Sequence, residues 1–271
     1  MFKTIFIDSL IVLSVLFFSL NQQKDQLAVH FLDIGQGDAI LIRTPQGQNI
    51  LIDGGPDNAV VYQLAEVLPW WERTIDYVVL THYHADHVIG LVEVFDKYKV
   101  NNVLINDHQP DHMLHYIFKD ALEEHNLKPT IVTAGEKFVL ADNLSWQVLL
   151  SDDYHEDYND NSIVMRLSYG DIDFLFTGDL TTIGEERLLS TGLVLESEVL
   201  KVCHHGSKYS SSEKFLEKVQ PEICIIQSGK NNKFGHPHQE ALDRLNNIGC
   251  QIKSNEHLGT ISIFSDGHSL Y

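Results

Sequence analysis

The residues best suited to chemistry are four potential metal ligands gathered in one short motif after an apolar run. The run covers residues 77–81, and the ligands that follow it are His82, His84, Asp86 and His87. Imidazole and carboxylate groups bind first-row divalent metals, and the end of a buried strand holds side chains more rigidly than a free loop. The spacing therefore predicts a metal site. A surface histidine cluster is the less favoured alternative, because histidine-rich tracts are typical of metal sites.

Four other stretches carry potential ligands or supporting groups. They are LIDGG at residues 51–55, FTGD at 176–179, CHHGS at 203–207 and GHPH at 235–238. Each stretch is weak by itself, since Asp179 alone would be an ordinary turn residue.

Together and in this order, the motifs resemble the signature of the metallo-β-lactamase superfamily over about residues 28–271. Within that superfamily, the sequence is similar to the hydrolase domain of competence DNA-uptake channel proteins. The stretches behind this similarity are FLDIGQGDA at residues 31–39, NSIV at 161–164, HHGS at 204–207 and GHPH at 235–238. Phosphorylcholine esterases of teichoic acid have similar motifs and are the close competitor. The resemblance implies an α/β fold, the four-layer αββα sandwich of the superfamily.

The resemblance also implies two divalent metal ions, Zn²⁺ or Mn²⁺, and assigns their ligands. The first metal would be bound by His82 and His84, and the second by Asp86, His87 and His205, with Asp179 bridging the two. His204 stays open as the alternative to His205, because adjacent histidines cannot be ranked from sequence. Asp53 would organise the loop beneath the metals.

The third ligand of the first metal departs from the wider superfamily pattern. A histidine is usual shortly before the strand that starts near residue 162, but Asn159, Asp160 and Asn161 stand there. Competence-type sequences have Asn at this place, so the resemblance makes Asn161 the predicted ligand, whereas His155 is out of step. Because an amide binds metal more weakly than imidazole and oxygen ligands favour harder ions, Mn²⁺ stays open beside Zn²⁺.

The predicted ligands favour hydrolysis by a hydroxide that bridges the metals. Two metal ions about 3.5–4 Å apart lower the pKa of a shared water enough to make it a nucleophile near neutral pH. Asp86 is predicted to orient this hydroxide, and His236 or His238 to donate to the oxyanion or protonate the leaving group. An even alternative for His236 is a structural role at a helix entry before Pro237.

Short strands and amphipathic helices must position these groups, and they alternate from residue 27 onward. The predicted strands cover residues 29–34, 39–44, 49–53, 77–81, 103–105, 130–132, 138–140, 145–150, 162–169, 172–177, 198–202, 223–227 and 260–264, with a hairpin turn at 170–171. The predicted helices cover residues 58–68, 88–98, 183–190, 211–219 and 239–247. Because no linker interrupts residues 27–271, we predict one domain there, with helices on the outer faces of sheets.

The first 26 residues differ from this domain in composition. Residues 10–20 form an apolar run, with Lys3 before it and a polar stretch at 21–26 after it. A spanning helix needs about 20 apolar residues, so the run better suits a secretory signal, or a membrane anchor formed by residues 5–20. We therefore predict an extracytoplasmic protein, secreted or anchored by its N-terminus. A buried N-terminal helix is the alternative.

Charge and cysteine content restrict the partners and the redox chemistry. The chain has 19 basic and 38 acidic residues and a formal net charge of −19, which should repel polyanions over most of its surface. A nucleic acid substrate would require a cleft lined by basic residues such as Lys201, Lys208, Lys230 and Lys233. The cysteines are odd in number and lack CxxC spacing, which predicts free thiols. They are Cys203, Cys224 and Cys250.

The predicted function is that of a phosphodiesterase acting outside the membrane on a phosphoester substrate such as single-stranded DNA. The alternatives are hydrolysis of small phosphoesters such as phosphorylcholine, hydrolysis of lactams or lactones, and a binding module that keeps the fold without catalysis. The missing third histidine and the lack of an extended apolar lid loop count against lactam hydrolysis. The nearly complete ligand set counts against the non-catalytic module. No protein partner is predicted.

Overall fold

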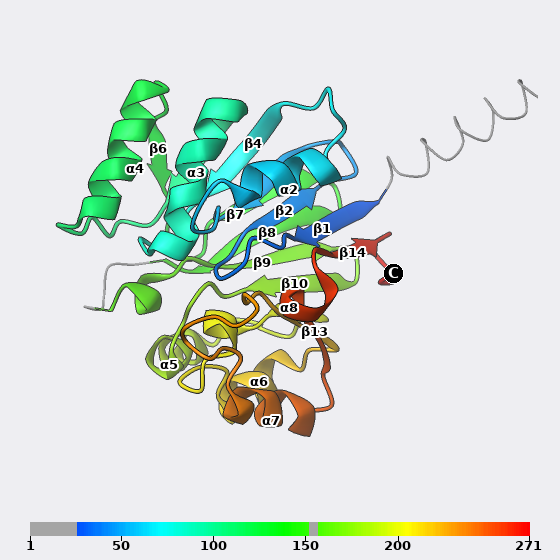
Figure 1. Cartoon of the computed structure of the whole chain (residues 1–271). Coiled ribbons are helices and arrows are strands. Elements are labelled where there is room, and N and C mark those ends of the chain that lie inside the picture. The colour runs from blue at the N-terminus through cyan, green and yellow to red at the C-terminus, as the bar shows by residue number, and fades with distance from the viewer. Residues whose placement is uncertain (1–25, 152–156) are drawn as a thin grey trace, which may run out of the picture.

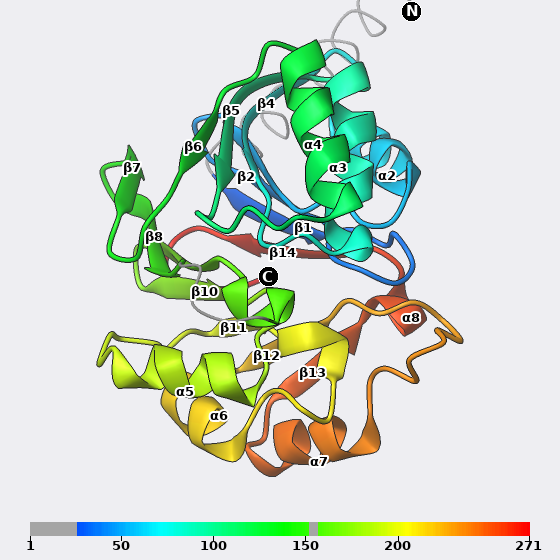
Figure 2. The ribbon, with the colours of Figure 1, turned by 90° about the vertical axis from the view of Figure 1, so that its left-hand side faces the viewer.

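Two β-sheets stack face to face in the computed structural model, which describes residues 26–151 and 157–271. Helices cover the outer face of each sheet, so the chain has four layers (Figure 1 and Figure 2). This arrangement is the αββα sandwich of the α/β class that the sequence predicts.

The first sheet combines antiparallel and parallel strands in the order β14-β1-β2-β3-β4-β5-β6. Its strands are β1 (Leu27–Phe31), β2 (Ile40–Arg43), β3 (Asn49–Ile52), β4 (Thr74–Val79), β5 (Lys99–Ile105), β6 (Pro129–Ile131) and β14 (Ile261–Ser265). Strands β3 to β6 pair in parallel, whereas β1 pairs antiparallel with both β2 and β14. The first and last of these strands in the sequence therefore lie side by side.

The second sheet has the order β13-β12-β11-β10-β9-β8-β7. Its strands are β7 (Lys137–Ala141), β8 (Leu144–Leu150), β9 (Val164–Tyr169), β10 (Ile172–Phe176), β11 (Val199–Lys201), β12 (Ile223–Ile226) and β13 (Gln251–Ser254). Strands β10 to β13 pair in parallel, and β9 and β10 form the predicted antiparallel hairpin. Each sheet thus has one parallel half, whose carboxyl ends can form a site.

The helices divide between the two outer layers (Figure 2). Those on the first sheet are α2 (Ala59–Val67), α3 (Ala85–Lys97) and α4 (Met113–Glu124), and those on the second are α5 (Thr182–Ser190), α6 (Glu213–Val219) and α7 (Gln239–Asn247). The described residues also form three short helices: α8 (Asn255–Leu258) and the 3₁₀ helices η2 (Tyr158–Asn161) and η3 (Cys203–Gly206). Helix α4 is absent from the sequence prediction.

Alternate side chains of a strand pack into two different apolar layers. In β3, Ile50 and Ile52 join the layer between the sheets, whereas Leu51 packs against the helices of the first sheet. Successive side chains of a strand point to opposite faces, so both faces of this strand are buried. Large side chains such as Trp146 and Phe174 fill the layer between the sheets. The strands that carry the predicted ligands are therefore held from both sides.

The prediction of free thiols is wrong for two of the three cysteines. Cys224 and Cys250 form a disulfide across a separation of 26 residues, and Cys203 is a buried free thiol. Cys224 lies in β12 and Cys250 directly precedes β13, the parallel neighbour of β12. The pairing of these strands brings the two sulfurs together, and no spacing pattern in the sequence reveals it.

Helix α3 begins at Ala85, three residues before the predicted start at residue 88. Asp86 and His87 therefore lie in its first turn, where a carboxylate interacts favourably with the helix dipole.

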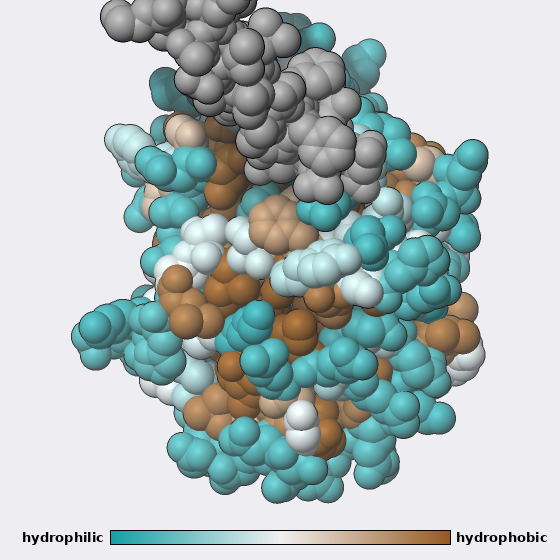
Figure 3. Space-filling view, turned by 90° about the vertical axis from the view of Figure 1, so that its right-hand side faces the viewer, coloured by the Kyte–Doolittle hydropathy of each residue, from teal (hydrophilic) through white to brown (hydrophobic). Residues whose placement is uncertain are grey.

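The predicted signal or anchor at residues 5–20 lies outside the described residues. Across residues 26–151 and 157–271, no helix is long and apolar enough to span a membrane. Figure 3 shows the face toward the start of β1, where apolar side chains lie among hydrophilic ones.

Candidate metal centre

The carboxyl ends of parallel strands in both sheets bring the predicted ligands together. His82 follows β4, and His87 lies at the start of α3, on the side of the first sheet. Asp179 follows β10 and His205 lies in η3 after β11, on the side of the second sheet. Binding sites form at this edge of α/β sheets, because the loops that leave it carry side chains toward one another.

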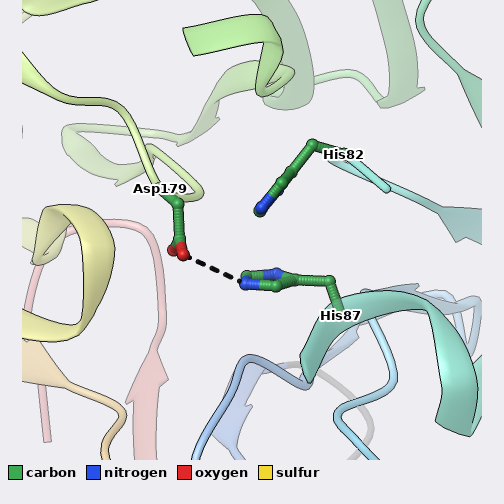
Figure 4. A group of neighbouring side chains, drawn as sticks. All are labelled: His82, His87 and Asp179. Carbon is green, nitrogen blue, oxygen red and sulfur yellow. Dashed lines mark hydrogen bonds and ion pairs between the residues drawn. The ribbon is translucent and has the colours of Figure 1, made fainter. Parts of the chain in front are cut away.

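Three histidines and two aspartates form overlapping groups with the spacing of metal ligands. One group is His82, His87 and Asp179 and another is Asp86, His87 and His205, with the ligand atoms of each group within 4.8 Å of one another. Figure 4 shows His82 and His87 pointing toward Asp179. The Oδ2 atom of Asp179 lies 3.3 Å from His87 Nε2 and 3.2 Å from His205 Nε2. Asp179 thus lies between the ligands of the two sheets, as a bridging role requires.

Asp53 orients His87 from beneath the cluster. Its Oδ2 atom lies 2.8 Å from His87 Nδ1 and accepts a hydrogen bond of 2.7 Å from the Thr81 hydroxyl. Its Oδ1 atom accepts a bond of 2.8 Å from the Thr81 backbone N–H. An ionised carboxylate only accepts, so the His87 proton belongs on Nδ1, and Nε2 is left to bind a metal.

Glycine residues let α3 approach the turn that follows β3. A Cβ atom on Gly90 would lie 1.8 Å from the Gly54 carbonyl oxygen, and one on Gly54 would lie 2.4 Å from the Leu91 nitrogen. The Gly54 N–H donates to the His87 carbonyl at 2.8 Å. Only glycine permits this packing, which anchors the helix start that presents the ligands.

His82 and His84 lie together at the first predicted metal position. His82 Nε2 is 3.1 Å from His84 Nδ1, which is close enough for both nitrogens to serve one ion. The other nitrogen of His82 lies 3.0 Å from the Thr81 hydroxyl and 3.4 Å from the Ser162 hydroxyl. Ser162 also accepts a bond of 3.1 Å from the Asp179 backbone N–H, which ties the two sides of the cluster together.

His205 is held by partners that the sequence prediction left without a role. Its Nδ1 atom lies 2.8 Å from the Gln227 carbonyl oxygen and 3.3 Å from Asp38 Oδ1, so Nε2 faces the cluster. Asp38 in turn pairs with the Lys201 ammonium at 2.5 Å. Lys201 is 1% exposed, so it cannot be one of the cleft-lining basic residues that a nucleic acid substrate would require. A buried lysine needs a carboxylate partner, and Asp38 provides it.

The geometry separates the two adjacent histidines of the CHHGS motif. Both have left-handed backbone conformations, with φ of 47° at His204 and 54° at His205. His204 Nε2 is 3.8 Å from Asp179 Oδ2, against 3.2 Å for His205. In the described part of the chain, His205 joins the ligand groups and His204 does not. The geometry therefore favours His205 as the ligand, with His204 beside it.

Asn161, the predicted amide ligand, ends η2 directly before Ser162. It is buried, and its backbone carbonyl accepts a bond of 2.6 Å from the Asn106 side chain. The neighbouring Asp160 carboxylate accepts two backbone N–H groups at the start of α5 and so stabilises that helix. This places Asn161 beside the cluster, while metal ligation by it stays a prediction. His155 lies outside the described residues.

Charges within the cluster shift its pKa values in opposite directions. Burial opposes protonation of His87, but Asp179 and Asp53 outweigh it and raise the pKa of His87 well above its usual value. Burial likewise opposes ionisation of Asp179, but His205 and His87 hold its pKa well below the usual range. Burial, and next the charge of His87, lower the pKa of His82 well below normal. The buried carboxylates therefore require positive charge nearby.

Two buried atoms of the cluster fit metal ligation directly. Asp179 Oδ1 and His205 Nε2 make no hydrogen bond to any described residue, although both are shielded from solvent. Buried polar atoms are normally satisfied, and a divalent ion would satisfy both of these as well as balance the carboxylates. The residues present thus fit divalent metal binding, and Asp179 with the histidines around it would hold the metal.

His236, the predicted proton donor, lies next to the ligands. Its ring centroid is 5.5 Å from that of His204 and 6.1 Å from that of His205. Burial, and then the charges of His205 and His204, lower the pKa of His236 to about 4, so the ring is neutral near neutral pH. A neutral imidazole still donates one N–H, which suits an oxyanion better than protonation of a leaving group. It also precedes Pro237 through a cis peptide bond, and α7 begins at Gln239 after the N-cap His238, so Pro237 lies outside the first helical turn.

The sequence profile described as "Metallo-beta-lactamase superfamily" matches residues 32–229. This chain belongs to the metallo-β-lactamase superfamily. The matched stretch includes every predicted ligand from both sheets. It also includes Asp38, Asp53 and Lys201, which support those ligands from beneath.

The superfamily member is similar to two competence proteins over most of its length. ComE operon protein 3 of Bacillus subtilis (strain 168) is 30% identical over 252 residues, which cover 86% of this chain and 32% of that protein. Competence protein ComA of Neisseria gonorrhoeae is 31% identical over 241 residues, which cover 88% of this chain and 32% of that protein. The predicted similarity to competence proteins is confirmed, and the chain spans about a third of the length of these curated relatives.

The fold is also found in a solved structure. CmlA, a diiron β-hydroxylase from Streptomyces venezuelae, aligns with a TM-score of 0.54 at 14% identity over 87% of this chain and 53% of that chain. At this identity, the similarity supports the metallo-β-lactamase fold alone.

Sequence reasoning missed the ion pair of Asp38 and Lys201, although one signal was present. Lys201 stands in the otherwise apolar run VLKVC of residues 199–203. A charged residue in a buried strand needs a partner of opposite charge. The partner could not be named from sequence, because Asp38 comes from the other sheet.

Proposed function

We propose that this superfamily member is a metal-dependent phosphodiesterase that cleaves single-stranded nucleic acid. The observation that carries the proposal is the buried cluster in which one Asp179 oxygen lies 3.2 Å from His205 and 3.3 Å from His87. Ligands from both sheets would hold two divalent ions, Mn²⁺ or Zn²⁺. When bound, such ions polarise a phosphoester oxygen and lower the pKa of water.

Two residues of the chain are suited to act on the substrate itself. The Asp86 side chain is 25% exposed, whereas Asp179 and His205 are almost fully buried, so Asp86 can contact water or substrate. We propose that Asp86 orients the attacking water. His236 lies beside His204 and His205, and its neutral ring can donate a hydrogen bond to a phosphoryl oxygen.

Exposed lysines beside His236 and His238 support a phosphoester over a lactam substrate. The Lys208 backbone N–H donates to His238 Nδ1 at 3.2 Å, and Lys233 is exposed in the loop before His236. Positive charge at this position attracts phosphates, although the chain as a whole has a net charge of −19. The names of the competence relatives favour DNA as the polymer. We further propose that the enzyme acts outside the membrane, because residues 10–20 are typical of a secretory signal or anchor.

Cleavage of end-labelled single-stranded DNA tests the proposal. Metal-free protein is compared with protein given Mn²⁺ or Zn²⁺, and Asp86→Ala is prepared in parallel. We expect cleavage that requires metal and falls to background in Asp86→Ala. Folded, metal-loaded protein that cleaves no DNA would exclude the nuclease function.

A small phosphoester such as phosphorylcholine is the second candidate substrate. The specific observation in its favour is that Phe234 and Tyr209, two exposed rings near His236, each lie under a lysine ammonium group. Aromatic faces that attract an ammonium group also attract the quaternary ammonium of choline. Hydrolysis of a chromogenic phosphorylcholine ester, without cleavage of DNA, would support this candidate instead.

A further inference from the structure

An exposed aromatic ring extends the site outward through His236. The Phe234 ring stacks on His236 with centroids 5.7 Å apart and planes 20° apart. His236 lies 5.5 Å from His204, whose Nε2 is 3.8 Å from Asp179 Oδ2. Phe234 is 48% exposed although its side chain is large and apolar. A ring supported from one side and open to solvent offers a surface on which a planar group can lie.

A second exposed ring connects to the same histidine. Tyr209 is 65% exposed, and the residue before it, Lys208, donates its backbone N–H to His238 Nδ1 at 3.2 Å. The His238 ring lies 4.8 Å from the His236 ring. Phe234 therefore contacts His236 directly, and Tyr209 follows a residue that is bonded to the neighbouring His238.

A lysine ammonium group lies over each of the two rings. Lys208 Nζ lies 5.2 Å from the centroid of Tyr209, and Lys233 Nζ lies 4.9 Å from the centroid of Phe234. Neither lysine forms an ion pair with a carboxylate in the part of the chain that the structure describes. Two such lysines provide local positive charge in a chain whose net charge is −19.

We propose that Lys208, Tyr209, Lys233 and Phe234 form a basic aromatic strip that binds the nucleotides next to the scissile phosphodiester. The inference rests on the proposed function and names the residues that recognise the single strand. Unpaired bases stack on the two rings, and the displaced ammonium groups contact the backbone phosphates. Aromatic stacking combined with basic groups is how single strands are bound without sequence preference.

The charge of the strip favours a polynucleotide over a choline ester. Choline would have to displace a lysine ammonium from its ring while keeping two like charges close together. A single strand uses both components, because its bases occupy the rings while its phosphates neutralise the lysines. Removing a lysine should therefore weaken nucleic acid binding and strengthen choline binding.

Binding of a fluorescent phosphorothioate oligothymidylate to the metal-loaded full chain tests the strip, since this ligand resists hydrolysis. We expect Phe234→Ala to weaken binding by about five- to hundredfold, the range for loss of one stacked base. Phe234→Tyr, which keeps a ring, should restore the affinity. Lys208→Gln and Lys233→Gln should each reduce the slope of log affinity against log salt by about 0.7. The matched control is Lys99→Gln, at the start of β5 on the opposite edge, which should change neither quantity.

The proposed strip would be overturned if Phe234→Ala bound oligothymidylate as tightly as the wild type and if both lysine variants kept the wild-type salt slope. Phosphorylcholine binding by a wild-type chain that does not bind oligothymidylate would overturn it in favour of a cation site. Hydrolysis of the small diester bis(p-nitrophenyl) phosphate tests the proposed function separately. If the diester is hydrolysed and the variants bind oligothymidylate normally, the strip fails alone. If the variants lose binding and neither DNA nor the diester is hydrolysed, the proposed function fails and the strip stands only as a surface that binds single strands.

Discussion

The two sheets contribute to the candidate metal centre in different ways. The first sheet supplies its ligands from one contiguous motif, from His82 to His87, at the end of β4 and the start of α3. The second supplies Asp179 and His205 from separate loops after β10 and β11. One strand end and one helix start can position contiguous ligands. Ligands from separate loops depend on contacts between residues that are distant in sequence.

The groups that support the ligands differ in the same way. His87 is held by Asp53, which follows β3, the neighbour of β4 in the same sheet. His205 is held by Asp38 from the first sheet, and Asp38 is neutralised by Lys201 from the second. The contact of His205 with Asp38 therefore requires correct docking of the two sheets, whereas the contact of His87 with Asp53 requires only the first.

The largest expected effect comes from breaking the ion pair between the sheets. Lys201→Met leaves the Asp38 carboxylate buried without its cation, which costs about 3–5 kcal/mol of unfolding free energy. Urea denaturation measures this loss. The double variant Asp38→Asn with Lys201→Met removes both charges and should recover much of the stability. A loss below about 1 kcal/mol in Lys201→Met would show that the pair does not hold the sheets together.

The next largest effect on the unfolding free energy should come from protonation of a buried histidine outside the site at acidic pH. His30 in β1 bonds to the Ser262 hydroxyl at 2.7 Å, and burial, followed by the charge of Arg43, lowers its pKa from 6.5 to about 4. The unfolded chain therefore takes up this proton first as the pH falls from 6.5 to 4. Stability is lost across that window, on the order of 3 kcal/mol, and none is lost above it.

Comparison of the wild type with His30→Gln isolates the contribution of His30 to the pH dependence of stability. The difference between their unfolding free energies should change between pH 7 and pH 4, with the wild type losing more. Parallel pH dependence of the two proteins would contradict the assignment to His30.

The smallest effect is expected on metal affinity in Asp53→Asn, which changes a support that lies entirely on the side of the first sheet. Asn tolerates the left-handed backbone of Asp53, with φ of 56°, but it provides no carboxylate to hold the His87 proton on Nδ1. Metal affinity, measured by competition with a metal indicator, should fall about 10–100-fold. The matched control is Asp171→Asn, in an exposed carboxylate–histidine pair with His268, which should not change it. Equal metal affinity in the two variants would contradict a supporting role for Asp53.

The sequence predicted the first half of the site better than the second, for a physical reason. A contiguous motif after an apolar strand is a local pattern, so His82, His84, Asp86 and His87 could be identified as a group. The choice between His204 and His205, in contrast, depends on distances to Asp179 across the fold, which sequence cannot provide.

The remaining misses also involve partners that only tertiary structure brings together. Cys224 and Cys250 are neighbours because β12 and β13 pair in parallel. The burial of Lys201 depends on Asp38, which lies in the loop between β1 and β2 of the other sheet. Local strand patterns, by comparison, predicted most strands of both sheets but not β13 (Gln251–Ser254), because alternation of apolar residues is fixed by backbone geometry, whereas the αββα layers followed from the family resemblance.

Metal binding by Asp179→Asn, measured against the wild type, tests the central claim that both sheets share one metal centre. Calorimetric titration of metal-free protein with Mn²⁺ or Zn²⁺ gives the stoichiometry and the affinity. We predict about two ions per wild-type chain, and an affinity loss in Asp179→Asn beyond the roughly 10–100-fold that orienting residues cost. Wild-type stoichiometry and affinity in this nearly isosteric variant would contradict a centre bridged by Asp179.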